Sequence, residues 1–247
     1  MQETSSIVNG MADLANIQLA AVVAETLLNR SAGQDGIGVM YGPSGFGKTV
    51  AVSRVANLHD GYYVRLSDTW TRKVMLQKIL FELGVTAVGT LSQMLDQAAE
   101  QLATSRRLLI LDEFDYAASS AAKVNLIRDL HDNSNKSAIL CVGEEALSFK
   151  LAEHKNFYGR VFRWAPAQPV CLADAHKLMA MYCGPVTVAD DLLAVLVKQV
   201  KGSVRLAVNN LEFIKETAIN EGWDVVTREH WGNRTLYTGS APRRGGE

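Results

Sequence analysis

Residues 42–49 read Gly42-Pro43-Ser44-Gly45-Phe46-Gly47-Lys48-Thr49. They follow an apolar run typical of a β-strand, residues 37–41, and lead into a stretch typical of a helix, residues 50–57. This is the phosphate-loop pattern G-x-x-x-x-G-K-[ST] in the strand–loop–helix setting that it requires. Its glycines let successive backbone N–H groups face an anion at the positive end of the following helix. The pattern therefore predicts a site for a nucleotide polyphosphate.

All eight residues of this loop, together with Val50, are predicted to contact the nucleotide. Lys48 is expected to reach the β- and γ-phosphates of ATP, and the Thr49 hydroxyl is expected to ligate Mg²⁺. The alternative is a glycine-rich turn that matches the pattern by accident. The strand before the loop and the helix after it favour nucleotide binding.

An acidic motif follows a second apolar run. Four aliphatic residues, 108–111, precede Asp112-Glu113-Phe114-Asp115. Such a run suits a central strand of a parallel sheet, and ligands of these sheets bind outside the carboxyl ends of the strands. We expect Asp112 to hold Mg²⁺ through water and Glu113 to polarise the attacking water, which predicts hydrolysis. Asp115 is predicted to cap the next helix. A buried strand that ends in a solvated acidic turn is the alternative.

Composition sets modest bounds on the function. The chain has 247 residues, 48% of them hydrophobic, and a formal net charge of −1. Near-neutral charge argues against a general basic surface that coats DNA, so any nucleic-acid contact is expected to be local. We expect a soluble protein of the bacterial or phage-infected host cytoplasm, because no apolar run is long enough to cross a membrane and residues 1–6 do not resemble a secretory signal. The three cysteines, Cys141, Cys171 and Cys183, are predicted to be buried and reduced. We expect no metal other than Mg²⁺.

Strand-like and helix-like stretches alternate along the first two thirds of the chain. Besides the two motif strands, we expect strands at residues 62–66 and 137–143, and helices at residues 12–30, 72–83, 91–103 and 121–131. Alternation of this kind produces parallel crossovers. The predicted fold class is therefore α/β, with a three-layer, parallel-sheet nucleotide-binding domain.

The pattern changes near residue 166. Beyond it we find three helical stretches, residues 172–183, 189–200 and 203–220, and no clear strand, which predicts a small all-helical domain. The expected organisation is an N-terminal helix and loop (1–34), an α/β nucleotide-binding domain (35–166), a helical lid (167–232) and a flexible tail (233–247). The tail contains Arg243 and Arg244, for which we expect disorder rather than a partner-binding role.

An α/β nucleotide domain followed by a helical domain resembles the AAA+ ATPases. The resemblance implies that residues 138–143 form the sensor 1 strand, after which either Glu144 replaces the usual polar residue or the contact is missing. It also implies that Arg160 is an arginine finger that reaches the γ-phosphate bound by a neighbouring subunit, with Arg163 as the second choice. Gly202-Ser203-Val204-Arg205 resembles the sensor 2 motif, so Arg205 would contact the nucleotide of its own subunit. Structural alternatives remain: both finger candidates could flank an edge strand, and Arg205 could be a solvated first-turn residue.

Within AAA+, residues 35–220 look most like the small transposition regulators, the Mu B-protein family of transposing phages and its TnsC relatives. The resemblance rests on a compact ATPase, on the segment from residue 139 to residue 162, and on a helix that follows the second strand directly. It implies an ATP-dependent homo-oligomer, a filament or ring on double-stranded DNA, that selects target sites without sequence preference and recruits a transposase or integrase. We expect no room for the extra N-terminal DNA-binding domain that Mu B-type proteins can carry, so any DNA contact is expected to come from the ATPase domain itself.

The same resemblance places the DNA contacts on loops near the second strand. Lys73, with Arg72, would meet the phosphate backbone, and Thr90 would add a hydroxyl contact. Such contacts bind DNA without reading bases. A solvated helix face is an equally good explanation of Arg72 and Lys73.

Three functional hypotheses follow. The first is the DNA-filament ATPase of transposition. The second retains the ATPase but changes the client to a replication origin, a helicase or another protein to be remodelled. The third is a nucleotide-gated binding module without turnover, against which Glu113 argues.

Overall fold

The computed structural model describes residues 7–8 and 11–239. Contacts within the chain divide it into two compact units. We term residues 16–44 and 48–167 the sheet unit, and the described part of residues 1–15, 45–47 and 168–247 the helical unit.

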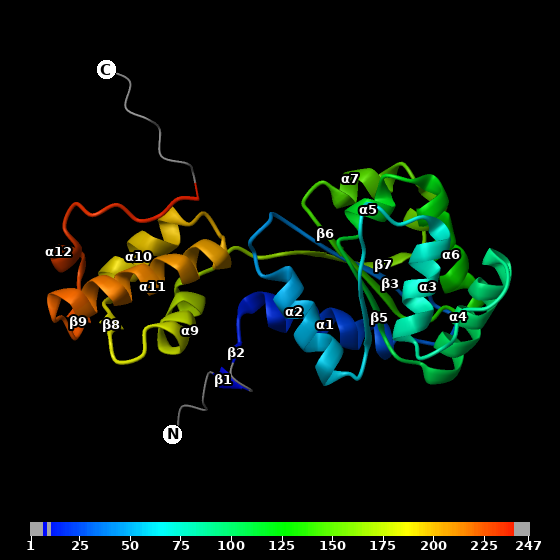
Figure 1. Ribbon diagram of the computed structural model, residues 1–247, viewed down its shortest axis with the longest axis horizontal. Coiled ribbons are helices and arrows are strands. Elements are labelled where there is room, and N and C mark those ends of the chain that lie inside the picture. The colour runs from blue at the N-terminus through cyan, green and yellow to red at the C-terminus, as the bar shows by residue number, and fades with distance from the viewer. Residues whose placement is uncertain (1–6, 9–10, 240–247) are drawn as a thin grey trace, which may run out of the picture. The chain divides into compact units, whose positions relative to one another are not determined.

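Five parallel strands form the centre of the sheet unit (Figure 1). Their order is β4-β5-β6-β3-β7. The strands are β3 (Ile37–Tyr41), β4 (Tyr62–Arg65), β5 (Leu109–Asp112), β6 (Ile139–Gly143) and β7 (Val161–Pro166). The predicted parallel α/β sheet is confirmed. The carboxyl ends of β3 and β5, which lead into the two sequence motifs, lie on either side of β6.

Helices cover both faces of this sheet (Figure 1). Helices α1 (Ala15–Leu28) and α2 (Lys48–Leu58) lie on one face. Helices α3 (Arg72–Glu82), α4 (Leu91–Ser105) and α6 (Ala121–Asn133) lie on the other. Three short helices complete the unit: α5 (Asp115–Ala118), α7 (Leu147–Ala152) and α8 (Lys155–Tyr158).

Strand alternation explains how each face of the sheet is filled. In β3, Ile37 and Val39 belong to the core cluster that also contains residues of α3, α4 and α6. Gly38 points to the opposite face, where a Cβ atom would lie 2.7 Å from Cδ1 of Leu27 on α1. Every residue of β5 and β6 is buried, as expected for central strands covered on both faces.

The helical unit contains four described helices and two short strand pairs. They are α9 (Leu172–Tyr182), α10 (Asp190–Gln199), α11 (Val204–Glu221) and α12 (Arg228–Trp231), with β1 (Ile7–Val8) antiparallel to β2 (Met11–Ala12) and β8 (Thr187–Val188) parallel to β9 (Val225–Val226). The prediction of an all-helical second domain is therefore wrong in this detail. Two-residue strands are too short to produce a recognisable alternation in the sequence.

The segment expected to be a flexible tail begins with an anchored stretch. The backbone N–H of Tyr237 donates to Oδ1 of Asn210 at 2.7 Å, and Nδ2 of Asn210 donates to the Tyr237 carbonyl at 2.9 Å. Asn210 is fully buried on α11, and Arg234 pairs with Glu221. Residues up to Tyr237 are thus tied to the helical unit, whereas Arg243 and Arg244 lie outside the described residues.

Two expectations concern the whole chain. All three cysteines are free; Cys141 and Cys183 are buried as predicted, but Cys171 is exposed, because it lies at the N-cap of α9. Among the described residues, no helix combines the length and apolar character needed to cross a membrane.

Candidate nucleotide-binding site

The loop at residues 42–49 has the backbone conformation that a phosphate loop needs. Gly45 and Gly47 have φ angles of +87° and +83°, a region that favours glycine because side chains clash there. Helix α2 begins at Lys48, immediately after these turns. The loop therefore ends at a helix N-terminus, where free N–H groups and the helix dipole favour an anion.

Lys48 lies against the loop and is surrounded by carboxylates. Its Nζ donates to the carbonyls of Gly42 (2.6 Å) and Pro43 (2.9 Å). Burial lowers the pKa of Lys48, and the negative charges of Glu144 and Asp112 oppose that shift. Two backbone carbonyls therefore hold the Lys48 amino group against the start of the phosphate loop.

Thr49 and Asp112 meet where β5 ends, as the two motifs predict. The Thr49 hydroxyl donates to Oδ2 of Asp112 at 2.9 Å, and Asp112 is only 3% exposed. A hydroxyl and a carboxylate are the oxygen ligands that Mg²⁺ prefers, and Mg²⁺ usually takes its remaining ligands from phosphates and water. The Thr49–Asp112 pair therefore fits a Mg²⁺ ion that accompanies the nucleotide.

Glu113 pairs with a residue that the sequence did not indicate. Its Oε1 lies 3.0 Å from Nη2 of Arg65, at the end of the neighbouring strand β4. The Glu113 carboxylate raises the pKa of Arg65. Glu113 also has a φ angle of +56°, which is uncommon for a residue with a side chain and typical of strained functional positions.

Asp115 does not cap α5, so that prediction is wrong. Phe114 occupies the N-cap position and no side chain bonds there. Instead, the Asp115 carboxylate accepts the backbone N–H of Glu144 at 2.6 Å and pairs with Nζ of Lys150 at 2.9 Å. Asp115 therefore links β5 to the segment after β6. Glu144 itself is exposed, and its sensor 1 role remains a prediction.

Arg160 lies at the amino ends of the parallel strands, whereas the phosphate loop lies at their carboxyl ends. It directly precedes β7, whereas the loop directly follows β3, and the two strands are parallel neighbours. A five-residue strand spans about 16 Å, so Arg160 cannot reach the loop of its own chain without rearrangement. Any contact of Arg160 with a γ-phosphate would therefore involve a second subunit.

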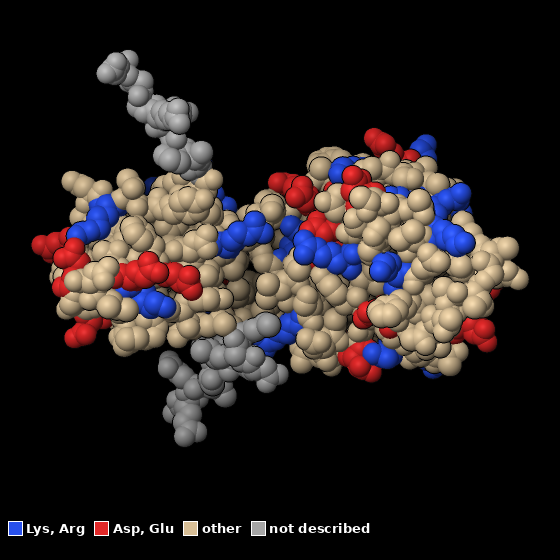
Figure 2. Space-filling model, viewed as in Figure 1, with Lys and Arg blue, Asp and Glu red and all other residues tan. Residues whose placement is uncertain are grey.

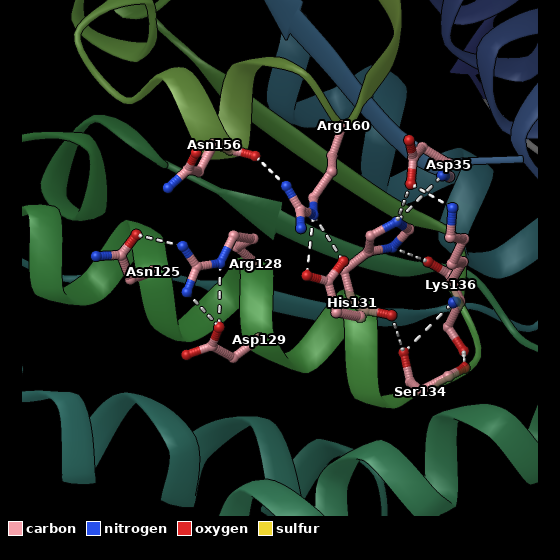
Figure 3. A network of polar contacts seen from close by, with 12 residues as sticks. Asp35, Asn125, Arg128, Asp129, His131, Ser134, Lys136, Asn156 and Arg160 are labelled. Carbon is pink, nitrogen blue, oxygen red and sulfur yellow. Dashed lines mark hydrogen bonds and ion pairs between the residues drawn. The ribbon is translucent and has the colours of Figure 1, made fainter.

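The Arg160 guanidinium is held by an aspartate and a carbonyl (Figure 3). Its Nε donates to both carboxylate oxygens of Asp132, at 2.7 and 3.0 Å, and its Nη1 donates to the Asn156 carbonyl. Asp132 raises the pKa of Arg160. These groups line a surface cavity of about 550 Å³. The second finger candidate, Arg163, is exposed within the edge strand β7.

His131 supports the segment that carries Asp132 (Figure 3). Its imidazole is fully buried, with Nδ1 3.0 Å from the Ser137 carbonyl and Nε2 3.4 Å from the backbone nitrogen of Gly36. Since Nε2 accepts from an N–H group, the proton of the neutral ring belongs on Nδ1. Burial lowers the pKa of His131, and the contacts with the Ser137 carbonyl and the Asp35 carboxylate oppose that shift. The ring connects α6 to the start of β3.

Arg205 lies at the start of α11 within the helical unit. Its backbone N–H donates to the carbonyl of Gly45, which belongs to the same unit, at 3.2 Å. Ser203 caps the helix through a bond to the N–H of Leu206 at 3.2 Å. The role of the Arg205 guanidinium toward a phosphate remains a prediction.

The predicted DNA contacts occupy exposed helix N-termini. Arg72 and Lys73 form the first turn of α3, and Thr90 is the N-cap of α4. The Thr90 hydroxyl accepts a hydrogen bond from the N–H of Gln93 and so caps α4. This structural role was not considered when Thr90 was predicted to contact DNA. Figure 2 shows basic side chains spread among acidic and uncharged ones on the visible face of the sheet unit, with no continuous basic surface there.

The fold and the site can be compared with known proteins. Residues 30–151 match a family model described as "AAA domain". A search of curated protein sequences found no significant match. Among solved structures, the chain is similar to the ORC2 protein of Aeropyrum pernix in ADPNP–ADP complexes, with a TM-score of 0.64 and 18% identity over 87% of this chain and 65% of that chain.

Two further structures give similar values. The ORC1 protein of Aeropyrum pernix in complex with DNA has a TM-score of 0.59 and 19% identity, covering 87% of this chain and 62% of that chain. Cdc6p of Pyrobaculum aerophilum has a TM-score of 0.60 and 14% identity, covering 85% and 62%. The chain spans less than two thirds of the length of each, and at these identities the likeness establishes the fold alone. The comparisons do not support the narrower resemblance to the Mu B and TnsC proteins. Residues 30–151 are thus similar to an AAA domain, and the chain has the parallel-sheet P-loop fold found in AAA+ proteins.

Proposed function

We propose that the chain is a Mg²⁺-dependent ATPase that acts on double-stranded DNA as a homo-oligomer. The observation that carries the proposal is the meeting of Lys48, Thr49 and Asp112 where β3 and β5 end. These residues supply the phosphate cation, the Mg²⁺ hydroxyl and the Mg²⁺ carboxylate of phosphoryl-transfer sites.

Glu113 would provide the base that orients the attacking water. It follows Asp112 directly and contributes to the field around Lys48. Mg²⁺, when bound with ATP, would neutralise charge on the phosphates. Arg65 holds the Glu113 carboxylate in the conformation described here, and we expect this pair to open during turnover.

The active site would be completed by Arg160 of a neighbouring copy. Two observations support this role. Arg160 lies at the opposite end of the strands from the phosphate loop, and it lines a surface cavity. A guanidinium supplied by a second subunit stabilises charge in the transition state. Assembly and hydrolysis would then be coupled.

Contact with DNA is supported by two kinds of observation. Arg72 and Lys73 are exposed at the N-terminus of α3, where they can meet phosphates. The similar ORC1 structure is a complex with DNA. A few contacts per subunit can suffice when many subunits repeat along one duplex.

Two biological roles fit a DNA-dependent ATPase. One is target selection in DNA transposition, with a filament that recruits a transposase or integrase, as the sequence resemblance implied. The second is replication initiation or helicase loading, which the similarity to ORC and Cdc6 proteins favours.

Electron microscopy with linear duplex DNA and a slowly hydrolysed ATP analogue tests the proposal and separates these roles. Continuous filaments on DNA of arbitrary sequence would support the transposition role. Discrete rings, or particles confined to particular sequences, would support the initiator role. A chain that neither assembles nor binds DNA under these conditions would contradict DNA as its client.

A further inference from the structure

The carboxylate of Asp112 is held by three donors from the protein. Its Oδ2 accepts the Thr49 hydroxyl at 2.9 Å and the phenol of Tyr63 at 2.8 Å. Its Oδ1 accepts the backbone N–H of Glu113 at 2.9 Å. Since a carboxylate offers about four acceptor positions, these donors leave roughly one for a ligand.

Strand alternation brings Tyr63 to this carboxylate. Tyr62 and Val64 belong to the core cluster on the α3 side of the sheet, so Tyr63 points to the α2 side. Leu109 and Leu111 belong to the same cluster, so Asp112 also points to the α2 side. Because β4 pairs directly with β5, the two side chains meet on one face.

Helix α2 covers this pair with two hydroxyl groups. Thr49 and Ser53 are four residues apart and therefore lie on one face of the helix. Thr49 donates to Asp112, and the Ser53 side chain bonds to Tyr63. A continuous chain of hydrogen bonds thus joins Ser53, Tyr63, Asp112 and Thr49.

The Tyr63 phenol is the donor in its bond to Asp112, because an ionised carboxylate can only accept hydrogen bonds.

We propose that Tyr63 is a positioning residue for the Mg²⁺ that accompanies the nucleotide. Its phenol fixes the rotamer of Asp112, so that the remaining acceptor position of the carboxylate faces the metal site formed with Thr49. The inference rests on the proposed function and adds to it a residue of β4 that lies in neither sequence motif. Outer-shell partners of metal-binding side chains characteristically tune affinity for the metal in this way.

The test measures how strongly Mg²⁺ promotes nucleotide binding. A fluorescent, slowly hydrolysed ATP analogue is titrated with the 247-residue chain in EDTA and then over a range of Mg²⁺ concentrations. In Tyr63→Phe, we expect the half-saturating Mg²⁺ concentration to rise by roughly 10-fold, the lower end of the range for outer-shell substitutions. The affinity measured in EDTA should stay within about twofold of wild type, because the phosphate loop is untouched.

Matched variants distinguish the positioning of Asp112 by Tyr63 from a general contribution of a tyrosine to packing. Tyr62→Phe removes a phenol from the same strand, but Tyr62 faces the core under the Arg107 guanidinium, so its Mg²⁺ dependence should equal that of wild type. Ser53→Ala should produce a smaller shift than Tyr63→Phe in the same direction.

Two results would overturn the inference. One is a Tyr63→Phe chain with the Mg²⁺ dependence of wild type. The other is a chain that loses affinity equally in EDTA and in Mg²⁺ and unfolds at a lower temperature, which indicates a packing role. A wild-type chain that binds the analogue without any response to Mg²⁺ would contradict the Mg²⁺ role in the proposed function, on which the inference rests, and a folded wild-type chain that binds no analogue would contradict the proposed function as a whole.

Discussion

Nη2 of Arg65 lies 3.0 Å from Oε1 of Glu113, so the residue proposed as the catalytic base is ion-paired with the neighbouring strand. The pair is partly exposed, with side-chain exposures of 62% for Arg65 and 29% for Glu113. Exposed pairs contribute little to stability, and this one can therefore open during turnover.

Arg65→Ala should raise the basal ATPase rate by about two- to fivefold, because an exposed pair restrains the carboxylate only weakly. ATP affinity should not change, since Arg65 does not contact the phosphate loop. Steady-state hydrolysis and equilibrium binding of ATP check this, with Glu113→Gln as the control that binds ATP but does not hydrolyse it. A fall in rate for Arg65→Ala would show that the pair orients Glu113 productively.

Arg160→Ala should bind ATP normally and hydrolyse it about 10³-fold more slowly or worse, since a missing arginine finger costs at least that much. Mixing Arg160→Ala with Glu113→Gln provides the decisive comparison. Each variant is inactive alone, but in a mixture an intact Arg160 from one subunit can complete the intact site of the other.

Recovered hydrolysis in the mixture therefore supports a shared active site. No recovery, with co-assembly verified by light scattering, would place the finger elsewhere. Full activity of Arg160→Ala alone would point to Arg163, which should then be tested in the same mixing experiment.

Lys73→Ala should weaken DNA binding and reduce the salt dependence of its affinity, by about one unit of log–log slope for each DNA phosphate that the side chain neutralises. The matched control is Lys78→Ala, an exposed lysine farther along the same helix. Fluorescence anisotropy with a duplex at several salt concentrations measures both slopes. Equal slopes for Lys73→Ala and wild type would remove Lys73 from the DNA interface.

His131 should make folding stability pH-dependent below neutrality. Burial lowers the pKa of His131 in the folded protein, so the unfolded chain takes up a proton first as the pH falls. Stability should therefore decline as the pH falls below about 6.5, the ordinary value for histidine, and stay flat with respect to this group above it.

Urea unfolding of wild type and His131→Gln between pH 7.5 and 5.5 tests this relationship. The variant should be less stable at pH 7.5, where it loses native hydrogen bonds, but show a shallower decline toward pH 5.5. His176→Gln, at a partly exposed position, should decline as wild type does. If the curves of unfolding free energy against pH were parallel for wild type and His131→Gln, His131 would not be the cause of the decline in stability.

The places of the two contiguous motifs in the fold could be predicted from the sequence. Residues 42–49 and 112–113 each occupy a short window, and the strand before each motif fixes where it lies in a parallel sheet. The chemical roles of these residues stay predictions. Three helices of the second unit, α9, α10 and α11, were also predictable, because each spans ten residues or more with apolar residues at helical spacing. The four-residue helix α12 was not predicted.

Partners from different strands could not be predicted in the same way. Alternation indicates that Tyr63 and Arg65 share a face of their strand, but it does not reveal that β4 pairs with β5 or in which register. The contacts of Tyr63 with Asp112 and of Arg65 with Glu113 depend on that register. For the same reason, Asp115 was assigned a local capping role, whereas its partners are the backbone of Glu144 and the side chain of Lys150, about 30 residues away.

Isothermal titration of the folded chain with Mg²⁺–ATP tests the central claim most directly. We expect one binding site per chain, abolished in Lys48→Ala and weakened in Asp112→Asn, with both variants retaining wild-type circular dichroism. A well-folded wild-type chain that releases no heat and shows no affinity for ATP would contradict the account.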